Sequence, residues 1–136
     1  MAPSGAIAFV RKGRILMKKF EAVITAIGDM VEEFIEQKMI ILFDESAPQE
    51  LREISVVHKG GKLAEDLVPG DVLYLGRASY KVTAVGDVAN KNLGKIGHVC
   101  LKFDGKTTPE LPGNIHLEEK EIPLPKVGEE ILIQGN

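Results

Sequence analysis

The sequence ISVVHKGGK, residues 54–62, combines a β-branched run, a histidine and a double glycine. Isoleucine and valine favour a pleated strand, and Gly60-Gly61 is a turn dipeptide that tolerates positive φ. This pattern predicts that His58 ends a strand at the lip of a tight turn. We therefore expect the strand to fix the base of the imidazole and one edge of the ring to be exposed.

The glycine turn after His58 also suits an anion. Successive backbone N–H groups in such a turn can form a concave nest for phosphate, and Lys59 and Lys62 add positive charge beside it. A histidine with an ordinary pKa of about 6.5 has a neutral, nucleophilic nitrogen at neutral pH. One reading is a histidine that accepts a phosphoryl group, with Lys59, Gly60 and Gly61 binding the phosphate. The other is an ordinary β-hairpin with a histidine at its rim.

Length and composition predict one globular domain. The 136 residues are enough for a single core, and 44% hydrophobic with 27% charged residues is typical of a folded chain. An aromatic content of 5%, without Trp, and a net charge of −3 argue against nucleic-acid binding. The single cysteine, Cys100, excludes an internal disulfide and fits a reducing cytoplasm. No apolar run is long enough to predict a membrane span.

Residues 1–16 differ from the rest of the chain. They contain three basic residues and no acidic one, which leaves 14 basic against 20 acidic residues, a net charge of −6, in residues 17–136. The basic residues follow the short apolar run 6–10, which is the reverse of their order in a secretory signal. Because Met17-Lys18-Lys19 resembles an ordinary bacterial start, we interpret residues 1–16 as a cloning-derived leader or a misplaced start, and residues 17–136 as a single domain.

Short alternating segments with turn signals between them recur along the chain. They predict about eight short strands and two short helices, which indicates an all-β fold, a small barrel or sandwich. The strands are expected at residues 20–28, 39–43, 54–58, 72–75, 79–85, 98–103, 114–118 and 129–134.

Helix signals occur at three places. Asp29 is expected to cap a first short helix, and Gly86-Asp87 to begin a second. Gly94 and Gly97 are expected to break that second helix. Pro48–Leu51 has the proline-first pattern of a single helical turn.

Three dipeptides predict turns that end strands. Asp104-Gly105 is a strong hairpin signal after strand 98–103. Pro69-Gly70 is typical of a type II turn, and Pro112-Gly113 turns the chain once more. Together these turns separate the short strands of the expected barrel or sandwich.

The three histidines are the remaining candidates for chemistry, because the chain has no Gly-rich nucleotide loop, Cys pair or nucleophile elbow. His98 shares a strand face with Cys100, a residue type that is usually buried, which indicates a structural role. His116 shares a polar face with Asn114, where its ring could donate a hydrogen bond to a phosphoryl group on His58. A metal site made by the three histidines is an alternative, although the familiar short metal spacings are absent.

The middle of the chain resembles one family. The matching residues are YKVTAVG (80–86), VA (88–89), NL (92–93), GHV (97–99), FDG (103–105), Glu110, PG (112–113) and His116, with ITxIG at 24–28. This pattern is similar to the glucitol/sorbitol-specific enzyme IIA component of the bacterial phosphoenolpyruvate-dependent sugar phosphotransferase system. The resemblance covers roughly Lys18 to Glu130.

The resemblance implies a cytoplasmic phosphotransferase component with a phosphohistidine intermediate. Such components take a phosphoryl group from the phosphocarrier HPr and pass it to a cysteine of the cognate IIB component, which phosphorylates a hexitol during uptake with the membrane component IIC. No cofactor, metal or nucleic acid is implied. A regulatory β-barrel module without transfer activity is the alternative.

The resemblance also implies site residues. Val56-Val57-His58 and Gly61-Lys62-Leu63 fall on the positions around the family's phosphorylated histidine, so His58 is the expected catalytic residue. A second histidine that some members carry two positions later is replaced here by Gly60. His116 is the expected supporting residue. Nε2 of His58 is the expected reactive nitrogen because it reaches furthest from the backbone.

Overall fold

A computed structural model of the protein describes residues 7–11 and 14–135. Within these residues, nine strands and three short helices follow one another along the chain. The helices are α1 (Val31–Glu36), α2 (Gln49–Arg52) and α3 (Ala89–Ile96). The strands are β1 (Ile7–Arg11), β2 (Arg14–Ile27), β3 (Met39–Asp44), β4 (Ser55–Lys59), β5 (Val72–Leu75), β6 (Ala78–Val85), β7 (Val99–Lys102), β8 (Asn114–Leu117) and β9 (Glu130–Gly135).

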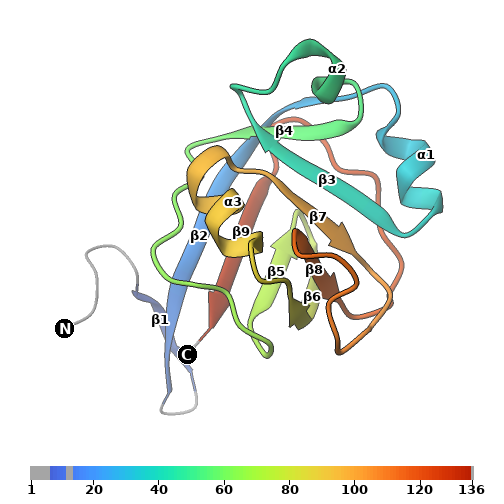
Figure 1. Ribbon diagram of the computed structural model, residues 1–136. Coiled ribbons are helices and arrows are strands. Elements are labelled where there is room, and N and C mark those ends of the chain that lie inside the picture. The colour runs from blue at the N-terminus through green and yellow to red at the C-terminus, as the bar shows by residue number, and fades with distance from the viewer. Residues whose placement is uncertain (1–6, 12–13, 136) are drawn as a thin grey trace.

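Eight of the strands form a closed barrel (Figure 1). Their hydrogen-bonded order is β2-β4-β3-β7-β8-β6-β5-β9, and β9 pairs with β2 to complete the ring. β1 lies outside the ring and pairs with the first residues of β2. The predicted all-β fold is therefore confirmed, and of its two alternatives, barrel and sandwich, the structure is the barrel, whose closure removes the open sheet edges that a sandwich would leave.

Two neighbouring pairs of barrel strands are parallel, β3 with β4 and β7 with β8. Parallel neighbours need a crossover connection instead of a tight turn. α2 lies in the first crossover, and residues 103–113 form the second. Asp104-Gly105 therefore begins a crossover, and the predicted hairpin at this position is wrong because β8 runs in the same direction as β7.

Alternate residues of the barrel strands fill the interior. Ile24, Leu42, Val56, Leu101 and Ile115, one each from β2, β3, β4, β7 and β8, are at most 1% exposed. Side chains two positions apart share one face of a strand, and fully burying one of this size contributes about 1.5–3 kcal/mol. This inward face positions the candidate site, because the next inward position of β4 after Val56 is a histidine.

The helices differ from the sequence-based expectation at their ends. Met30, and not Asp29, is the N-cap residue of α1, and it makes no side-chain cap hydrogen bond. α3 continues through Gly94 and ends at Gly97, whose φ of 64° is left-handed. A glycine in this conformation commonly follows the last helical residue. The helical turn predicted near Pro48 is α2, which brings the number of helices to three in the described residues.

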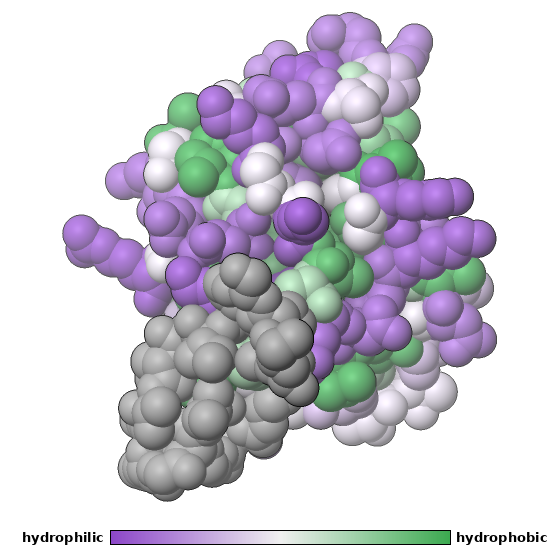
Figure 2. Space-filling model, turned by 90° about the vertical axis from the view of Figure 1, so that its left-hand side faces the viewer, coloured by the Kyte–Doolittle hydropathy of each residue, from purple (hydrophilic) through white to green (hydrophobic). Residues whose placement is uncertain are grey.

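The outer surface is largely polar. On the face shown in Figure 2, hydrophilic side chains predominate and hydrophobic ones lie among them. The most exposed large apolar side chains include Val68, Leu111 and Val127, which come from separate connecting segments. In the part of the chain that the structure describes, no helix has the length and hydrophobicity needed to cross a membrane.

Candidate functional site

His58 lies near the C-terminal end of β4, and its side chain points into the barrel. It belongs to β4 and pairs with Ile24 of β2 and Asp44 of β3. Strand alternation puts it on the same inward face as Val56, and its exposed fraction is 0%. The predicted place near the end of a strand is confirmed. The predicted exposure of the ring edge is wrong, because neighbouring elements cover the end of this strand.

Three segments enclose the imidazole ring of His58. Phe20 of β2 meets it edge-on, with ring centroids 5.6 Å apart and planes at 85°. A Cβ atom placed on Gly97 would lie 2.6 Å from Cε1 of His58, and one placed on Gly61 would lie 3.0 Å from the same atom. These two glycines therefore let the backbone lie directly against the ring, which a side chain at either position would prevent.

The hydrogen bonding of His58 defines its tautomer. Its Nε2 lies 2.9 Å from the carbonyl oxygen of Gly97. A carbonyl oxygen can only accept, so Nε2 carries the hydrogen and Nδ1 is the unprotonated nitrogen. Nδ1 is buried and has no hydrogen-bond partner in the described residues. Leaving a buried acceptor unpaired costs about 1–3 kcal/mol, and such atoms call for a functional explanation.

Burial lowers the pKa of His58 below its ordinary value of 6.5, because desolvation disfavours the charged ring. The Gly97 carbonyl and the negative charge of Asp44 act in the opposite direction on this pKa and only partly offset burial. Asp44 itself accepts hydrogen bonds from the backbone N–H and the hydroxyl of Ser46. The ring is therefore neutral at neutral pH, with a carboxylate nearby that favours any positive charge developing on it.

The predicted phosphate-binding residues follow His58 directly, but they do not all approach its ring. Lys59 is exposed and, by strand alternation, points to the outer face of β4. Gly60 has a φ of 77° and open space beside its α-carbon. Gly61 lies against the ring, as described above. Of the three predicted residues, Gly61 therefore lies against the ring, whereas the Lys59 side chain points away from it.

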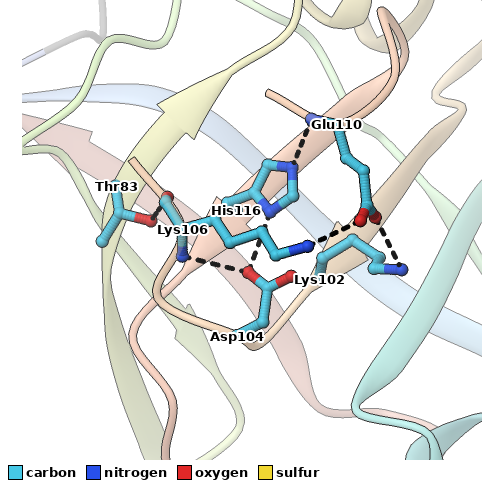
Figure 3. Close-up of polar contacts among 6 residues, drawn as sticks. All are labelled: Thr83, Lys102, Asp104, Lys106, Glu110 and His116. Carbon is cyan, nitrogen blue, oxygen red and sulfur yellow. Dashed lines mark hydrogen bonds and ion pairs between the residues drawn. The ribbon is translucent and has the colours of Figure 1, made fainter. Parts of the chain in front are cut away.

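His116 forms a second buried histidine site, in which both ring nitrogens are bonded (Figure 3). Nδ1 donates to Oδ1 of Asp104 over 2.8 Å, and Nε2 accepts from the backbone N–H of Glu110 over 3.1 Å. His116 shares the outer face of β8 with Asn114, as predicted, but both are buried under the crossover 103–113. The ring therefore has no free polar atom to offer to a ligand.

Charged groups extend this second site. Glu110 pairs with Lys106 over 2.6 Å and with Lys102 over 3.3 Å (Figure 3). Desolvation raises the pKa of Asp104, but hydrogen bonds from the His116 ring and the Lys106 backbone outweigh it and hold the pKa below its usual range. Thr83 of β6 donates to the Lys106 carbonyl over 2.6 Å. These contacts attach the crossover 103–113 to the barrel wall, which is a structural role.

The structure does not bring His58 and His116 together. His58 points into the barrel and His116 points away from it. The ladders also separate them along β3, since His58 pairs with Asp44 whereas His116 pairs with Lys102, which pairs with Met39. The stretch of β3 from Met39 to Asp44 spans about 16 Å. The predicted hydrogen bond from His116 to a phosphoryl group on His58 therefore has no geometric basis.

His98 has a structural environment, in line with the interpretation from its strand face. Its Nδ1 lies 3.1 Å from the carbonyl oxygen of Leu42, and its ring stacks on Phe43 with centroids 4.6 Å apart. Burial raises the pKa of the neighbouring Cys100 thiol. Across the described residues, no group of three or more His, Cys, Asp or Glu side chains is placed to hold a metal ion.

Sequence reasoning missed three residues that shape the His58 environment, namely Phe20, Asp44 and Gly97. The sequence places Phe20 in strand 20–28, Asp44 directly after strand 39–43 and Gly97 at the end of a helix, and nothing in it links these residues to the histidine. A signal existed for Gly97, because a glycine that ends a helix exposes its backbone to close approach. Phe20 and Asp44 carry no such local signal, since only strand pairing brings them to His58.

Comparison with a solved structure defines the class of protein. The chain is similar to "The Crystal Structure of PTS System IIA Component from Enterococcus faecalis V583", with a TM-score of 0.72 and 31% sequence identity. The match covers 82% of this chain and 96% of that chain. The barrel therefore has the fold of a solved IIA component of the phosphotransferase system.

Sequence comparisons narrow this class. The family "PTS system glucitol/sorbitol-specific IIA component" matches residues 19–132. The chain is also 42% identical over 98 residues to the PTS system glucitol/sorbitol-specific EIIA components of Shigella flexneri and Escherichia coli (strain K12), covering 72% of this chain and 80% of each relative. The chain therefore belongs to the glucitol/sorbitol-specific IIA family, which confirms the resemblance noted from sequence and supports a phosphocarrier role.

Proposed function

We propose that this chain accepts a phosphoryl group from the phosphocarrier HPr on His58 and passes it to a cysteine of the cognate IIB component. The transfer serves uptake of glucitol (sorbitol) through IIB and IIC components at the membrane, with this chain acting in the cytoplasm. One observation carries the assignment to His58. Its neutral ring has one nitrogen fixed by Gly97 and the other buried without a hydrogen-bond partner among the described residues, whereas both nitrogens of His116 are occupied.

The transfer is an in-line displacement at phosphorus. As the new bond forms between a His58 nitrogen and phosphorus, the bond between phosphorus and the donor's imidazole nitrogen breaks, and its electron pair returns to the donor. Such reactions depend on positioning and on neutralising charge. Backbone N–H groups of Gly60 and Gly61 meet the phosphoryl oxygens as a nest, and Lys59 adds positive charge from outside the wall.

Access requires that the cover over His58 opens. The ring is fully buried, and Gly61 lies against it. Gly60 has the positive φ and the open surroundings of a residue that can change conformation without a clash. In this proposal residues 60–62 move aside when the donor docks, and their amides then turn toward the transferred group.

The proposal is tested by incubating the chain with phosphoenolpyruvate, enzyme I and HPr and measuring acid-labile phosphate bound to it. His58→Gln keeps an amide that can donate to the Gly97 carbonyl but lacks a nucleophilic ring nitrogen. It is expected to fold normally, by circular dichroism, and to take up no phosphate. His98→Gln is the matched control and is expected to be phosphorylated like the unchanged chain.

Two results would contradict the proposal. Normal phosphorylation of His58→Gln would assign the phosphate to another residue. An unchanged chain that takes up no phosphate, while a known IIA component in the same mixture does, would favour the alternative, a regulatory barrel module without transfer activity.

A further inference from the structure

We propose that the C-terminal end of α3, with the exposed Ile96 at its centre and Lys62 and Lys95 beside it, is the docking surface for the phosphorylated donor HPr. This inference rests on the proposed function, because it names the surface to which the donor of that reaction binds. It gives a role to an exposed apolar side chain that lies outside the core of the barrel.

The position of the His58 ring locates this surface. Cε1 is the ring atom between the two nitrogens, and it belongs to the edge of the ring that faces away from the β4 backbone. A Cβ atom placed on Gly61 would lie 3.0 Å from Cε1, and one placed on Gly97 would lie 2.6 Å from it. This edge is therefore enclosed by the segment after β4 on one side and by the end of α3 on the other. A donor reaches the ring most directly at the junction of these two segments.

The two segments run side by side (Figure 1). A Cβ atom placed on Gly94 of α3 would lie 3.6 Å from the Leu63 side chain. Asn90 of α3 accepts a hydrogen bond from the backbone N–H of Leu67 over 2.7 Å and donates one to its carbonyl oxygen over 3.1 Å. From Leu63 onward the segment is thus held against α3, whereas residues 60–62 precede these contacts and are the part that moves when the donor docks.

Ile96 is the apolar residue at this junction. It is the last residue of α3, directly before Gly97, and it is 39% exposed. Ala89 and Leu93, the buried residues of α3, lie seven and three positions earlier, so Ile96 continues their apolar stripe beyond the part that the core covers. Single exposed apolar side chains are common. This one lies next to the backbone that encloses the proposed nucleophile, where a partner can cover it.

Lysines surround Ile96 at the junction. Within two positions of either enclosing glycine, the charged residues are Lys59, Lys62 and Lys95, and all three are exposed. None of the three forms an ion pair with another described residue. Asp44 approaches the end of α3 from β3, but the lysines outnumber it. Their charge complements the negative phosphoryl group of the donor and increases the rate of encounter.

This composition indicates the chemistry of the partner. An apolar centre within a polar rim is typical of the anatomy of protein interfaces. The donor is expected to present an apolar patch around its phosphohistidine, so that the patch covers Ile96 while the phosphoryl oxygens approach Lys62 and Lys95. A donor bound in this way also lies against residues 60–62, whose displacement uncovers His58 in the proposed function.

Single-turnover transfer from phospho-HPr, measured over a range of HPr concentrations, tests the apolar centre. Ile96→Ser leaves the core intact and has nearly the same helix propensity, so its circular dichroism is expected to be unchanged. We expect the half-saturating HPr concentration to rise about tenfold and the maximal rate to change less than about threefold, because docking is lost and chemistry is not. Leu111→Ser is the matched control. Leu111 is 62% exposed and lies near the other end of α3, where the backbone N–H of Val88 donates to the carbonyl oxygen of Pro112.

Charge reversal tests the rim. Lys62→Glu and Lys95→Glu are each expected to lower kcat/KM for phospho-HPr by about three- to tenfold at low salt, with a smaller difference at high salt because salt screens exposed charges. Lys81→Glu is the control. Lys81 is exposed on β6, which lies opposite β4 in the strand order of the barrel, and its reversal is expected to leave transfer unchanged.

The outcomes separate this inference from the proposed function. An unchanged chain that takes up no phosphate from HPr would overturn both. A phosphorylated chain in which Ile96→Ser and the two lysine variants match the unchanged chain would overturn the docking surface and leave the phosphocarrier role standing. The same holds if Leu111→Ser weakens HPr binding as much as Ile96→Ser does. A loss confined to the later transfer to IIB would assign this surface to the acceptor and overturn its assignment to HPr.

Discussion

The two buried histidines of this barrel have opposite hydrogen-bond patterns. His116 uses both nitrogens, toward Asp104 and Glu110, and fastens a crossover to the wall. His58 uses one nitrogen, toward Gly97, and its other nitrogen is buried with no hydrogen-bond partner in the part of the chain that the structure describes. Both are 0% exposed, so burial alone does not distinguish a structural histidine from a candidate nucleophile. What distinguishes them is whether each nitrogen already has a partner.

The segments that cover the two histidines also differ in how firmly they are held. The cover over His116 is held by Thr83 and by the ion pairs of Glu110 with two lysines. The cover over His58 includes Gly60 and Gly61, and Gly60 has open space around it. Few contacts and glycine-rich backbone are typical of segments that open at low cost. The open space at Gly60 is consistent with the opening that the proposed function requires at His58, whereas the contacts of Thr83 and Glu110 hold the cover over His116 in place.

The largest loss of stability and transfer rate is expected from Gly97→Ala, which adds a methyl group beside His58. In Gly97→Ala the added Cβ lies 2.6 Å from Cε1 and 2.9 Å from Nε2 of His58, at a residue with φ of 64°. Strain and overpacking together are expected to cost about 2–5 kcal/mol. Displacement of the ring is expected to slow phosphorylation by about 100-fold or more. Urea unfolding and single-turnover transfer from phospho-HPr measure the two effects.

Gly94→Ala is the matched control for this prediction. An added Cβ there meets Leu63 at 3.6 Å, an ordinary contact, and the position is exposed within α3. Replacing a helical glycine by alanine is expected to stabilise the protein by about 0.5–1 kcal/mol and to leave transfer unchanged. Equal stability and equal transfer rates of the two variants would show that the close contact between Gly97 and His58 does not matter for function.

The second prediction concerns His116, where we expect a loss of stability with little change in the transfer rate. His116→Ala leaves the Glu110 N–H and the Asp104 carboxylate without their partner and opens a cavity on the outer wall. We expect the free energy of unfolding to fall by about 2–4 kcal/mol. Because His116 lies on the opposite face of the wall from His58, the rate of transfer onto His58 is expected to change less than threefold.

Transfer kinetics measured well below the melting temperature of the His116→Ala variant check this expectation. A tenfold or greater loss of rate in a folded variant would restore the supporting role that the sequence suggested for His116. Asp104→Asn, which keeps the size of the side chain, should show the same separation of stability from rate. Together the two variants test whether this cluster is structural.

The third prediction concerns pH. The folded-state pKa of His58 is lowered by burial, so between that pKa and the unfolded value of about 6.5 the unfolded chain binds more protons. Stability is therefore expected to fall as pH drops below about 6.5, by at most about 1.4 kcal/mol per pH unit for this one group. In His58→Gln this part of the pH dependence should disappear. Denaturant unfolding at pH 5 to 8 measures both proteins, and parallel curves would remove His58 as the cause.

The sequence predicted the local structure better than the surroundings of the site. The β-branched run predicted strand β4, and the spacing of turns predicted an all-β barrel or sandwich. The exposure of His58 was wrong because the residues that cover it, Phe20 and Gly97, are distant in sequence and arrive through strand pairing and a helix end. The Asp104-Gly105 hairpin failed because the direction of β8 is set by closure of the barrel, which no dipeptide records.

The smallest effect is expected from deletion of residues 1–16, which contribute no described residue to either histidine site. That residues 17–136 form a single domain, with residues 1–16 as a leader, stays a prediction, and residues 1–6, 12–13 and 136 lie outside the described residues. β1 pairs only with the start of β2, up to Met17, and the ladder between β2 and β9 begins at Met17. His58 pairs with Ile24, about 23 Å further along β2.

Deletion of residues 1–16 therefore removes β1 and residues 14–16 of β2, which pair only with β1 among the described residues. We expect a melting temperature within about 2 °C of the full chain, which corresponds to about half a kcal/mol, and an unchanged rate of phosphorylation. Differential scanning calorimetry and the transfer assay on the two chains provide the measurement. A fall of several degrees would show that the hairpin of β1 and β2 stabilises the barrel end, and slower transfer with unchanged stability would indicate that this hairpin contacts the donor.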